Sequence, residues 1–299
     1  WSLPRVVYHL EDLRVGMSYP NYYISRLASK FVKVCLQGTG GDELYGGYPW
    51  RYYKIFNSVN QEEFFDQYYK FWQRLVSDND KTELFTKNVL KKIDINNPRK
   101  IFERVFTFNK KLNYKTPEDH INNSLYFEIK TFLPGLLLVG DKLSMANGLE
   151  ERFPFLDNDL VEYAQRIPVK HKLGNLEKEI EHIDENTLRK KQVYRQFNDG
   201  KNVFRKAMGN FIPEAIIEKK KQGFSAPDES WYRGENAEYI KELLLSENLA
   251  CADYINQNYI KKVVNEHIND GLNHRLLIWS FMNFEWWCRI FLNNENPYK

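Results

Sequence analysis

The spacing of hydrophobic residues changes near residue 55 and divides the chain into a short N-terminal part and a longer remainder. In the first part, compact apolar runs at residues 5–10 and 31–37 predict two buried strands. Ser18, followed by Pro20, predicts the start of a helix that continues to residue 30. These elements together predict a right-handed βαβ unit with parallel strands, in which ligands bind beyond the carboxyl ends of the strands.

Beyond residue 55, apolar residues recur every three or four positions, a pattern typical of amphipathic helices. We expect core-facing helical stripes over residues 61–75, 101–108, 121–139 and 271–292, and the aromatic residues of the first stripe are more typical of a core than of a ligand surface. Residues 173–199 are charged and poor in large apolar side chains, which predicts a solvated insertion, with a partner site as the alternative.

Composition excludes several classes of protein. The net charge of +3, from 43 basic and 40 acidic residues, is not the footprint of a nucleic-acid-binding protein. Apolar stretches fall far short of the ~18 residues of a membrane span, so we expect no membrane contact. Three scattered cysteines, Cys35, Cys251 and Cys288, predict neither a disulfide framework nor a zinc site and fit a cytoplasmic protein. We expect Cys35 to be a buried, inert thiol.

The densest chemical signal is the loop at residues 37–48, which holds five glycines in twelve positions. A glycine-rich loop after a strand lets backbone N–H groups approach an anion closely, because no Cβ intervenes. Asp42 could then hold a metal ion that such an anion carries. The alternative is that Asp42 caps a helix, and Glu43 is the better candidate for the cap or for a supporting contact.

Basic residues form a second group of candidates. The segment KKKQGF at residues 219–224 could neutralise a phosphate, or it could be a solvated helix end whose lysines suit the helix dipole. Lys201 and Arg205 are four residues apart on a helix predicted over residues 201–208, so both could face one cleft or both could face water.

A dense segment around residues 133–157 predicts a helix that ends near Gly148 and is followed by charged residues. We interpret Glu150 and Arg152 as a buried pair that pins a turn. Asp157 is placed to cap the next helix.

Together these segments resemble the synthetase domain of the asparagine synthetase (glutamine-hydrolysing) family. The matching stretches are GTGGDELYGGYPWRY at 38–52, LPGLLLVGDKLSMANGLEERFPFLD at 133–157, KKKQGF at 219–224 and LNHRLLIWSFMNFEWW at 272–287. Because four segments match in the family's order and spacing, the resemblance is more specific than any single glycine motif. It favours the functional interpretation of Asp42 and Lys221 over the structural one.

The resemblance implies an α/β fold with a partial parallel sheet of the adenine-nucleotide α-hydrolase-like (PP-loop ATPase) type and extensive helical additions. Residues 1–55 would form the nucleotide-site part, and residues 56–299 would be mainly helical. The implied chemistry uses ATP and Mg²⁺ to convert aspartate to β-aspartyl-AMP with release of pyrophosphate. Ammonia, delivered from glutamine by a separate N-terminal glutaminase domain, then gives asparagine and AMP. A homodimer is left open.

The same resemblance assigns individual residues. Its nucleotide and pyrophosphate positions are Gly38, Thr39, Gly40, Gly41 and Asp42. Asp42 is similar to the family's carboxylate for Mg²⁺ and pyrophosphate, and Lys221 to the lysine that stabilises charge on the adenylate. Lys201 matches a second catalytic basic position, and Arg14 an arginine near the acceptor amino acid.

Thr39 and Gln37 depart from the family pattern, which usually has Ser-Gly-Glu-Gly at residues 37–40. Threonine cannot act as a carboxylate base or attract ammonium. Either another group performs this role, or the acceptor and the nucleophile differ from aspartate and ammonia. The alternatives are therefore β-lactam synthetase-like or peptide-amidating chemistry, or a non-catalytic truncated interaction module.

The chain contains no Ser-Gly-Gly-x-Asp-Ser loop, which in the family binds pyrophosphate and lies upstream of the matched segments together with the glutaminase domain. We therefore expect this chain to be the C-terminal part of a longer protein and to lack most of the ATP phosphate site. The 299-residue chain alone should catalyse no ATP–pyrophosphate exchange and make no asparagine. Radiolabelled exchange by the isolated chain, above a buffer control, would contradict this expectation.

Overall fold

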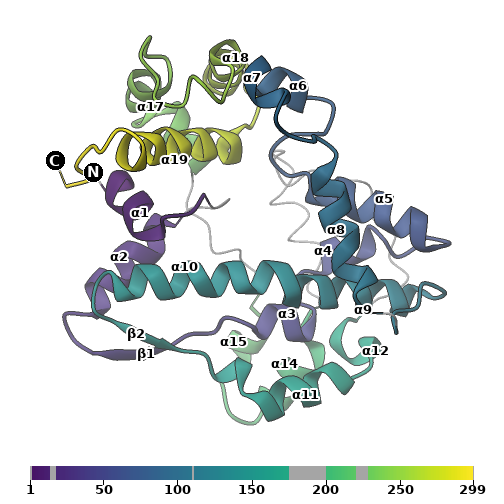
Figure 1. The fold of residues 1–299 in the computed structure, drawn as a ribbon. Coiled ribbons are helices and arrows are strands. Elements are labelled where there is room, and N and C mark those ends of the chain that lie inside the picture. The colour runs from purple at the N-terminus through teal and green to yellow at the C-terminus, as the bar shows by residue number, and fades with distance from the viewer. Residues whose placement is uncertain (1, 14–17, 110, 175–199, 220–227, 299) are drawn as a thin grey trace.

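The computed structural model describes residues 2–13, 18–109, 111–174, 200–219 and 228–298. Helices make up most of the chain, and one small parallel sheet lies at its side (Figure 1). The helical elements up to the sheet's second strand are α1 (Leu3–Leu10), α2 (Tyr19–Ala28), α3 (Gly41–Tyr45), α4 (Pro49–Tyr53), α5 (Gln61–Trp72), α6 (Lys81–Leu84), α7 (Lys87–Leu90), α8 (Asn97–Thr107), α9 (Pro117–Phe127), the π-helical η1 (Glu128–Phe132) and α10 (Leu133–Met145).

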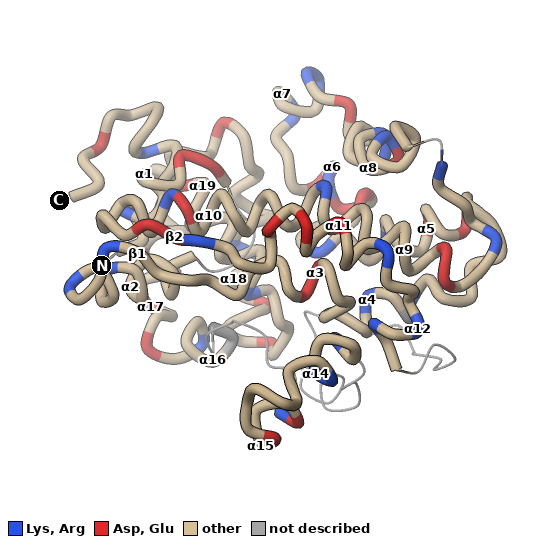
Figure 2. Tube along the Cα trace, turned by 90° about the horizontal axis from the view of Figure 1, so that it is seen from below, with Lys and Arg blue, Asp and Glu red and all other residues tan. Residues whose placement is uncertain are grey.

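After the second strand come η2 (Pro154–Leu156), α11 (Asn158–Arg166), α12 (Val169–Lys172), α14 (Asn202–Met208), α15 (Glu214–Ile217), α16 (Asp228–Arg233), α17 (Ala237–Leu244), α18 (Gln257–Ile268) and α19 (Arg275–Phe291). Within the described residues, no helix has the length and apolar character that crossing a membrane requires. Figure 2 shows basic and acidic residues interspersed along the chain.

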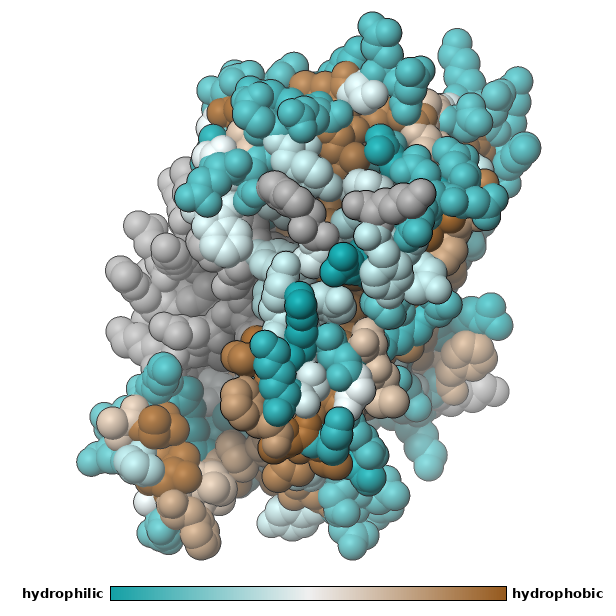
Figure 3. Space-filling view, turned by 90° about the vertical axis from the view of Figure 1, so that its left-hand side faces the viewer, coloured by the Kyte–Doolittle hydropathy of each residue, from teal (hydrophilic) through white to brown (hydrophobic). Residues whose placement is uncertain are grey.

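The sheet consists of β1 (Val34–Leu36) and β2 (Glu150–Arg152), which pair in parallel with Cys35 opposite Glu151. Parallel strands need a long crossover, and here it contains every helix from α3 to α10. The strand predicted at residues 31–37 is thus confirmed in a shorter form. Its apolar side chains are largely exposed, with Leu36 76% accessible, and Cys35 is half-buried rather than buried. Apolar side chains reach the surface on the face drawn in Figure 3.

The strand predicted at residues 5–10 is wrong, because this segment is the helix α1. Pro4 lies in the first turn, where its fixed φ suits a helix, and Val6, Val7 and Leu10 are buried at helical spacing. The helix packs against α19 and α10. A short apolar run cannot distinguish a buried strand from a buried helix, and with this strand the predicted βαβ unit also fails.

The other helix predictions are confirmed. The segment at residues 18–30 contains α2, and the three remaining stripes correspond to α5, α8 and α19, each shifted by a few residues at its ends. The stripe at residues 121–139 lies within α9, η1 and α10, which follow one another without a break and cross the middle of the molecule (Figure 1).

The aromatic stripe of α5 forms a core with α8 and α9, as expected from its spacing. Phe64 and Tyr68 are fully buried there, and Phe64 meets Phe106 edge to face with ring centroids 5.5 Å apart. A second core joins α17, α18 and α19 to Leu84. The first core includes Ile121, Leu125 and Phe127 of α9, so it anchors one end of the central rod, the continuous run of α9, η1 and α10.

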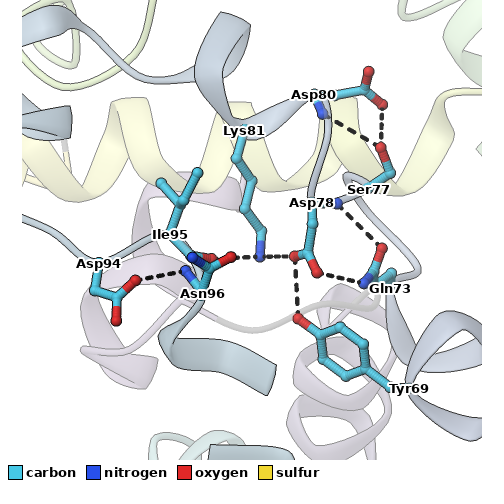
Figure 4. Close-up of polar contacts among 9 residues, drawn as sticks. All are labelled: Tyr69, Gln73, Ser77, Asp78, Asp80, Lys81, Asp94, Ile95 and Asn96. Atoms are coloured by element: carbon cyan, nitrogen blue, oxygen red, sulfur yellow. Dashed lines mark hydrogen bonds and ion pairs between the residues drawn. The ribbon is translucent and has the colours of Figure 1, made fainter. Parts of the chain in front are cut away.

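Asp78 ties the end of α5 to the start of α6 (Figure 4). Its carboxylate accepts hydrogen bonds from the Tyr69 hydroxyl at 3.1 Å and from Gln73 Nε2 at 2.9 Å, and it pairs with Lys81. Lys81 also donates to the Ile95 carbonyl oxygen at 3.4 Å. Asp78 and Lys81 together therefore join three segments of the helical part.

Replacing Asp78→Ala should lower the free energy of unfolding by about 1–2 kcal/mol, because three donors lose one acceptor. Urea unfolding of the purified chain measures the change. Glu238→Ala is the matched control: its carboxylate is 78% exposed and pairs with Lys241 on the surface, so its removal should be nearly neutral. Equal losses in the two variants would contradict the role assigned to Asp78.

Candidate functional site

The glycine loop follows the carboxyl end of β1 and leads into α3. Gly40 has φ +98°, and a Cβ there would come within 2.5 Å of Leu156 in η2. Only glycine allows both this backbone conformation and this close approach. Gly40 also occupies the position before the helix, so neither Asp42 nor Glu43 is the capping residue of α3. The loop is therefore pressed against the segment that follows β2.

Asp42 and Lys201, two residues predicted to belong to the site, meet in the structure. Lys201 Nζ lies 2.9 Å from Asp42 Oδ1, and both side chains are about one quarter exposed, at 26% and 22%. The backbone of Lys201 has φ +62°, and its N–H donates to the Tyr45 carbonyl at 3.0 Å. A Cβ on Gly200 would lie 2.5 Å from the Gly46 carbonyl oxygen. The chain at 200–201 therefore packs directly on the loop.

Lys201 precedes α14 rather than lying within it, and Arg205 points elsewhere. Arg205 donates to the carbonyl oxygens of Ile217 at 2.5 Å and Lys219 at 3.4 Å. The two basic residues thus share neither one cleft nor a solvated face. Lys201 faces the acidic loop, and Arg205 holds the chain that follows α15.

The remaining predicted positions divide into two groups. Gly38 is exposed, Thr39 is half-buried and Gly41 is buried. Lys221 and Arg14 lie outside the described residues, as does most of the charged segment at 173–199. The site that can be described is therefore the loop with Asp42 and Lys201.

Glu150 and Arg152 do form an ion pair, at 2.7 Å, but on the exposed surface of β2. Their side chains are 51% and 64% exposed, so the predicted buried pair is wrong. A turn was expected where the chain forms a strand, and alternate residues of a strand share one face. Asp157 caps α11 as predicted, accepting from the backbone N–H groups of Asp159 and Leu160.

A buried polar network behind the loop was missed by the sequence analysis. Glu128 in η1 is fully buried and accepts from Arg51 Nη1 at 3.2 Å and from the Tyr52 hydroxyl at 2.9 Å. The Arg51 guanidinium lies 3.9 Å from the Tyr48 ring centroid. The Tyr48 hydroxyl donates to Glu43 at 2.8 Å. The signal that could have revealed it was a charged residue, Glu128, inside an apolar helical stripe.

Burial controls the ionisation of both acids in this network. It raises the pKa of Glu128 to about 7, against the opposing effects of the Arg51 charge and the Tyr52 hydrogen bond. Burial also raises the pKa of Glu43, while the Tyr48 hydrogen bond lowers it. The charge of Glu43 raises the pKa of Glu128, the charge of Asp42 raises the pKa of Glu43, and the charge of Arg51 lowers the pKa of both acids. The network therefore retains protons more readily than exposed acids do.

These features define a class: a helix-rich α/β domain with a small parallel sheet and an acidic glycine loop at the carboxyl end of one strand. Residues 2–289 match the family described as asparagine synthase. The chain belongs to this asparagine synthase family, which confirms the resemblance seen in the sequence.

Curated relatives agree with the family assignment. The chain is 28% identical to asparagine synthetase [glutamine-hydrolyzing] 1 of Bacillus subtilis (strain 168), over 99% of this chain and 46% of the relative. It is 26% identical to asparagine synthetase 3 of the same organism, over 80% of the chain and 35% of the relative. A match to amidase chyE of Penicillium rubens, at 27% identity, covers 48% of the chain and 19% of that protein. The chain spans about half the length of the first of these relatives, and the family supports ligase-type amide formation.

The raised pKa of Glu128 predicts a pH dependence of stability. The unfolded carboxyl ionises near its ordinary value of 4.5 and the folded one near 7, so the folded chain binds the extra proton between these values. The contribution of Glu128 to the free energy of unfolding is therefore greatest below about pH 4.5 and falls as pH rises to about 7.

Glu128→Gln removes this titration. As pH rises from about 4.5 to about 7, the free energy of unfolding of the variant should increase relative to that of the parent by on the order of 3 kcal/mol. The reason is that one pKa unit corresponds to about 1.4 kcal/mol. Urea unfolding at several pH values measures the difference, with Glu43, Arg51, Tyr52 and Tyr68 still facing position 128 in both proteins. A constant difference at all pH values would show that Glu128 does not titrate in this way.

Proposed function

We propose that this protein uses ATP to convert a carboxylate into a carboxamide, by way of an acyl-adenylate and pyrophosphate, with aspartate as acceptor. The observation that carries the proposal is the Asp42–Lys201 pair on a glycine loop at the carboxyl end of β1, in a chain of the asparagine synthase family. Ligands of parallel α/β sheets bind at this edge.

The loop, Asp42 and Lys201 have the chemistry to hold ATP phosphates with Mg²⁺. Carboxylate oxygens are ligands that Mg²⁺ prefers, and a lysine acts as a point charge toward phosphate. Lys201 already offsets the charge of Asp42, so a bound pyrophosphate would draw Lys201 toward itself and leave the Asp42 carboxylate for the metal ion. Mg²⁺ would neutralise charge on the leaving pyrophosphate. Lys221 is proposed, by resemblance, to stabilise the same charge.

The exposed side of β1 supports a larger sheet of the PP-loop ATPase type. Val34 and Leu36 are 48% and 76% exposed, and Phe31 just before the strand is 79% exposed. Apolar side chains so open to water on a strand indicate a surface that another element covers. Among the described residues, β1 pairs with β2 alone. We propose that further strands and helices of the protein complete the sheet and the phosphate site.

The names of two relatives suggest a nitrogen source. Because these two relatives are named as glutamine-hydrolysing asparagine synthetases, we propose that ammonia comes from glutamine and is delivered by a glutaminase domain. A cytoplasmic location is proposed from the three scattered cysteines. A different acyl acceptor is the second candidate. Thr39 replaces the usual glutamate, and relatives named amidases match about half of the chain.

ATP–pyrophosphate exchange by the full-length protein, with aspartate and then other carboxylic acids, tests the proposal. Exchange that requires aspartate supports it, and exchange with another acid selects the second candidate. Failure with every acid would contradict both.

Asp42→Asn should lower the exchange rate by at least about 100-fold, the scale of losing one group that stabilises developing charge. Lys201→Met should also lower the exchange rate. Glu162→Gln on α11 is the control, because its carboxylate is 73% exposed and pairs with the similarly exposed Arg166 on the surface of this helix. If Asp42→Asn retained the parent rate, Asp42 would not be part of the nucleotide site.

A further inference from the structure

Lys201 is held against the glycine loop in an unfavourable backbone conformation. Its φ of 62° and ψ of 28° lie in the left-handed region, which glycine adopts far more readily than a residue with a side chain. Other residues in this region are strained and are found most often at functional sites. The chain therefore keeps a lysine at position 201 at a conformational cost, which indicates a role for its side chain.

The Asp42 carboxylate is fixed on the other side of this contact. The Gly47 N–H donates to the Asp42 carbonyl oxygen at 2.7 Å, and a Cβ on Gly47 would lie 1.8 Å from Asp42 Oδ1. Position 47 therefore has room for the carboxylate only because it is a glycine. Lys201 Nζ lies 2.9 Å from the same oxygen, Oδ1. The turn that closes the loop thus sets the position of the acid with which the lysine pairs.

The two charged groups remain accessible, with 26% of the Lys201 side chain and 22% of the Asp42 side chain exposed. Ion pairs with this much contact with water are weak enough to be exchanged for other partners. A metal ion that approaches Asp42 meets the positive charge of Lys201, and a phosphate that approaches Lys201 meets the negative charge of Asp42. Either ligand alone must break the pair and leaves one charge without its partner, whereas a metal ion and a phosphate together replace both partners.

A purely structural bridge is a poorer explanation of the pair, because backbone contacts already join the same two segments. The Lys201 N–H donates to the Tyr45 carbonyl oxygen at 3.0 Å. Gly200 lies so close to the loop that a Cβ there would come within 2.5 Å of the Gly46 carbonyl oxygen. Neither contact depends on the Lys201 side chain. The ion pair is therefore not needed to hold the chain before α14 on the loop.

We propose that the Asp42–Lys201 ion pair is a latch, a contact that opposes the binding of a divalent metal ion alone or of a phosphate alone and makes their binding cooperative. This inference rests on the proposed function, because it concerns the site proposed for ATP phosphates and Mg²⁺. By linkage, the factor by which phosphate raises the affinity for the metal ion equals the factor by which the metal ion raises the affinity for phosphate. The latch thus selects the metal–nucleotide complex over either free ion.

Binding of Mn²⁺ alone to the full-length protein tests the latch, with bound and free metal ion measured by electron paramagnetic resonance. Lys201→Met should raise the affinity for Mn²⁺ by about threefold or more, because the Asp42 carboxylate no longer has to leave an ion pair. Lys206→Met is the matched control, since it removes the same charge from an exposed position on α14 and should leave the affinity unchanged. No increase in Lys201→Met, or an equal increase in both variants, would overturn the proposal.

Binding of metal-free pyrophosphate, measured by calorimetry in the presence of EDTA, tests the other half of the latch. Asp42→Asn should raise the affinity for this anion by about threefold or more, because Lys201 is released from its partner. The same substitution should weaken binding of ATP with Mg²⁺, which needs the carboxylate. Glu162→Gln is again the control, with no change expected in either affinity. Pyrophosphate binding in Asp42→Asn that is no tighter than in the parent protein would contradict the latch.

Lys201→Gly distinguishes the latch from a structural bridge. Glycine relieves the left-handed backbone and removes the ammonium group, so the Tm should be equal to or higher than that of the parent, while the Mn²⁺ affinity rises as in Lys201→Met. A lower Tm with unchanged Mn²⁺ affinity would indicate a structural bridge and overturn the latch. Absence of ATP–pyrophosphate exchange in the parent protein would contradict the proposed function, whereas the measurements with single ions test the latch independently of exchange.

Discussion

The ion pair between Glu128 and Arg51 organises the site from within the core. A carboxylate at zero exposure is tolerable only when charge and hydrogen bonds compensate its lost hydration. Arg51 and Tyr52 supply both only in part, since burial still raises the pKa of Glu128, and their contacts hold α4 against the central rod. Arg51 in turn lies on the Tyr48 ring, and Tyr48 holds Glu43 beside Asp42. The buried ion pair is therefore connected, through Tyr48, to the residue that follows Asp42 in the glycine loop.

Close approach of backbones is the second constraint on the site. Gly40 allows the loop to press on η2, and Gly200 allows the chain before α14 to lie on the loop carbonyl at Gly46. These contacts bring Lys201 to Asp42 although the two residues are far apart in sequence. A larger side chain at either glycine would separate the acid from the lysine.

Prediction from sequence succeeded where one local property decided the outcome. Helical spacing located α5, α8 and α19, and the cap residue Asp157 located the start of α11. It failed where packing against another element determines the secondary structure. The run at residues 5–10 was predicted as a strand but is a helix that packs against α19 and α10. The strand at β1 was recognised, but its partner β2 follows a crossover whose length no local pattern encodes.

The family and the glycine loop could be identified from the sequence alone, because contiguous motifs retain their order and spacing without any knowledge of contacts. The tertiary structure alone decided which charges meet. It paired Lys201 with Asp42, directed Arg205 to the end of α15, buried Glu128 beside Arg51, and joined Glu151 to Gln37. Electrostatic and hydrogen-bond energies depend on distance and burial, and these arise only when segments remote in sequence pack together.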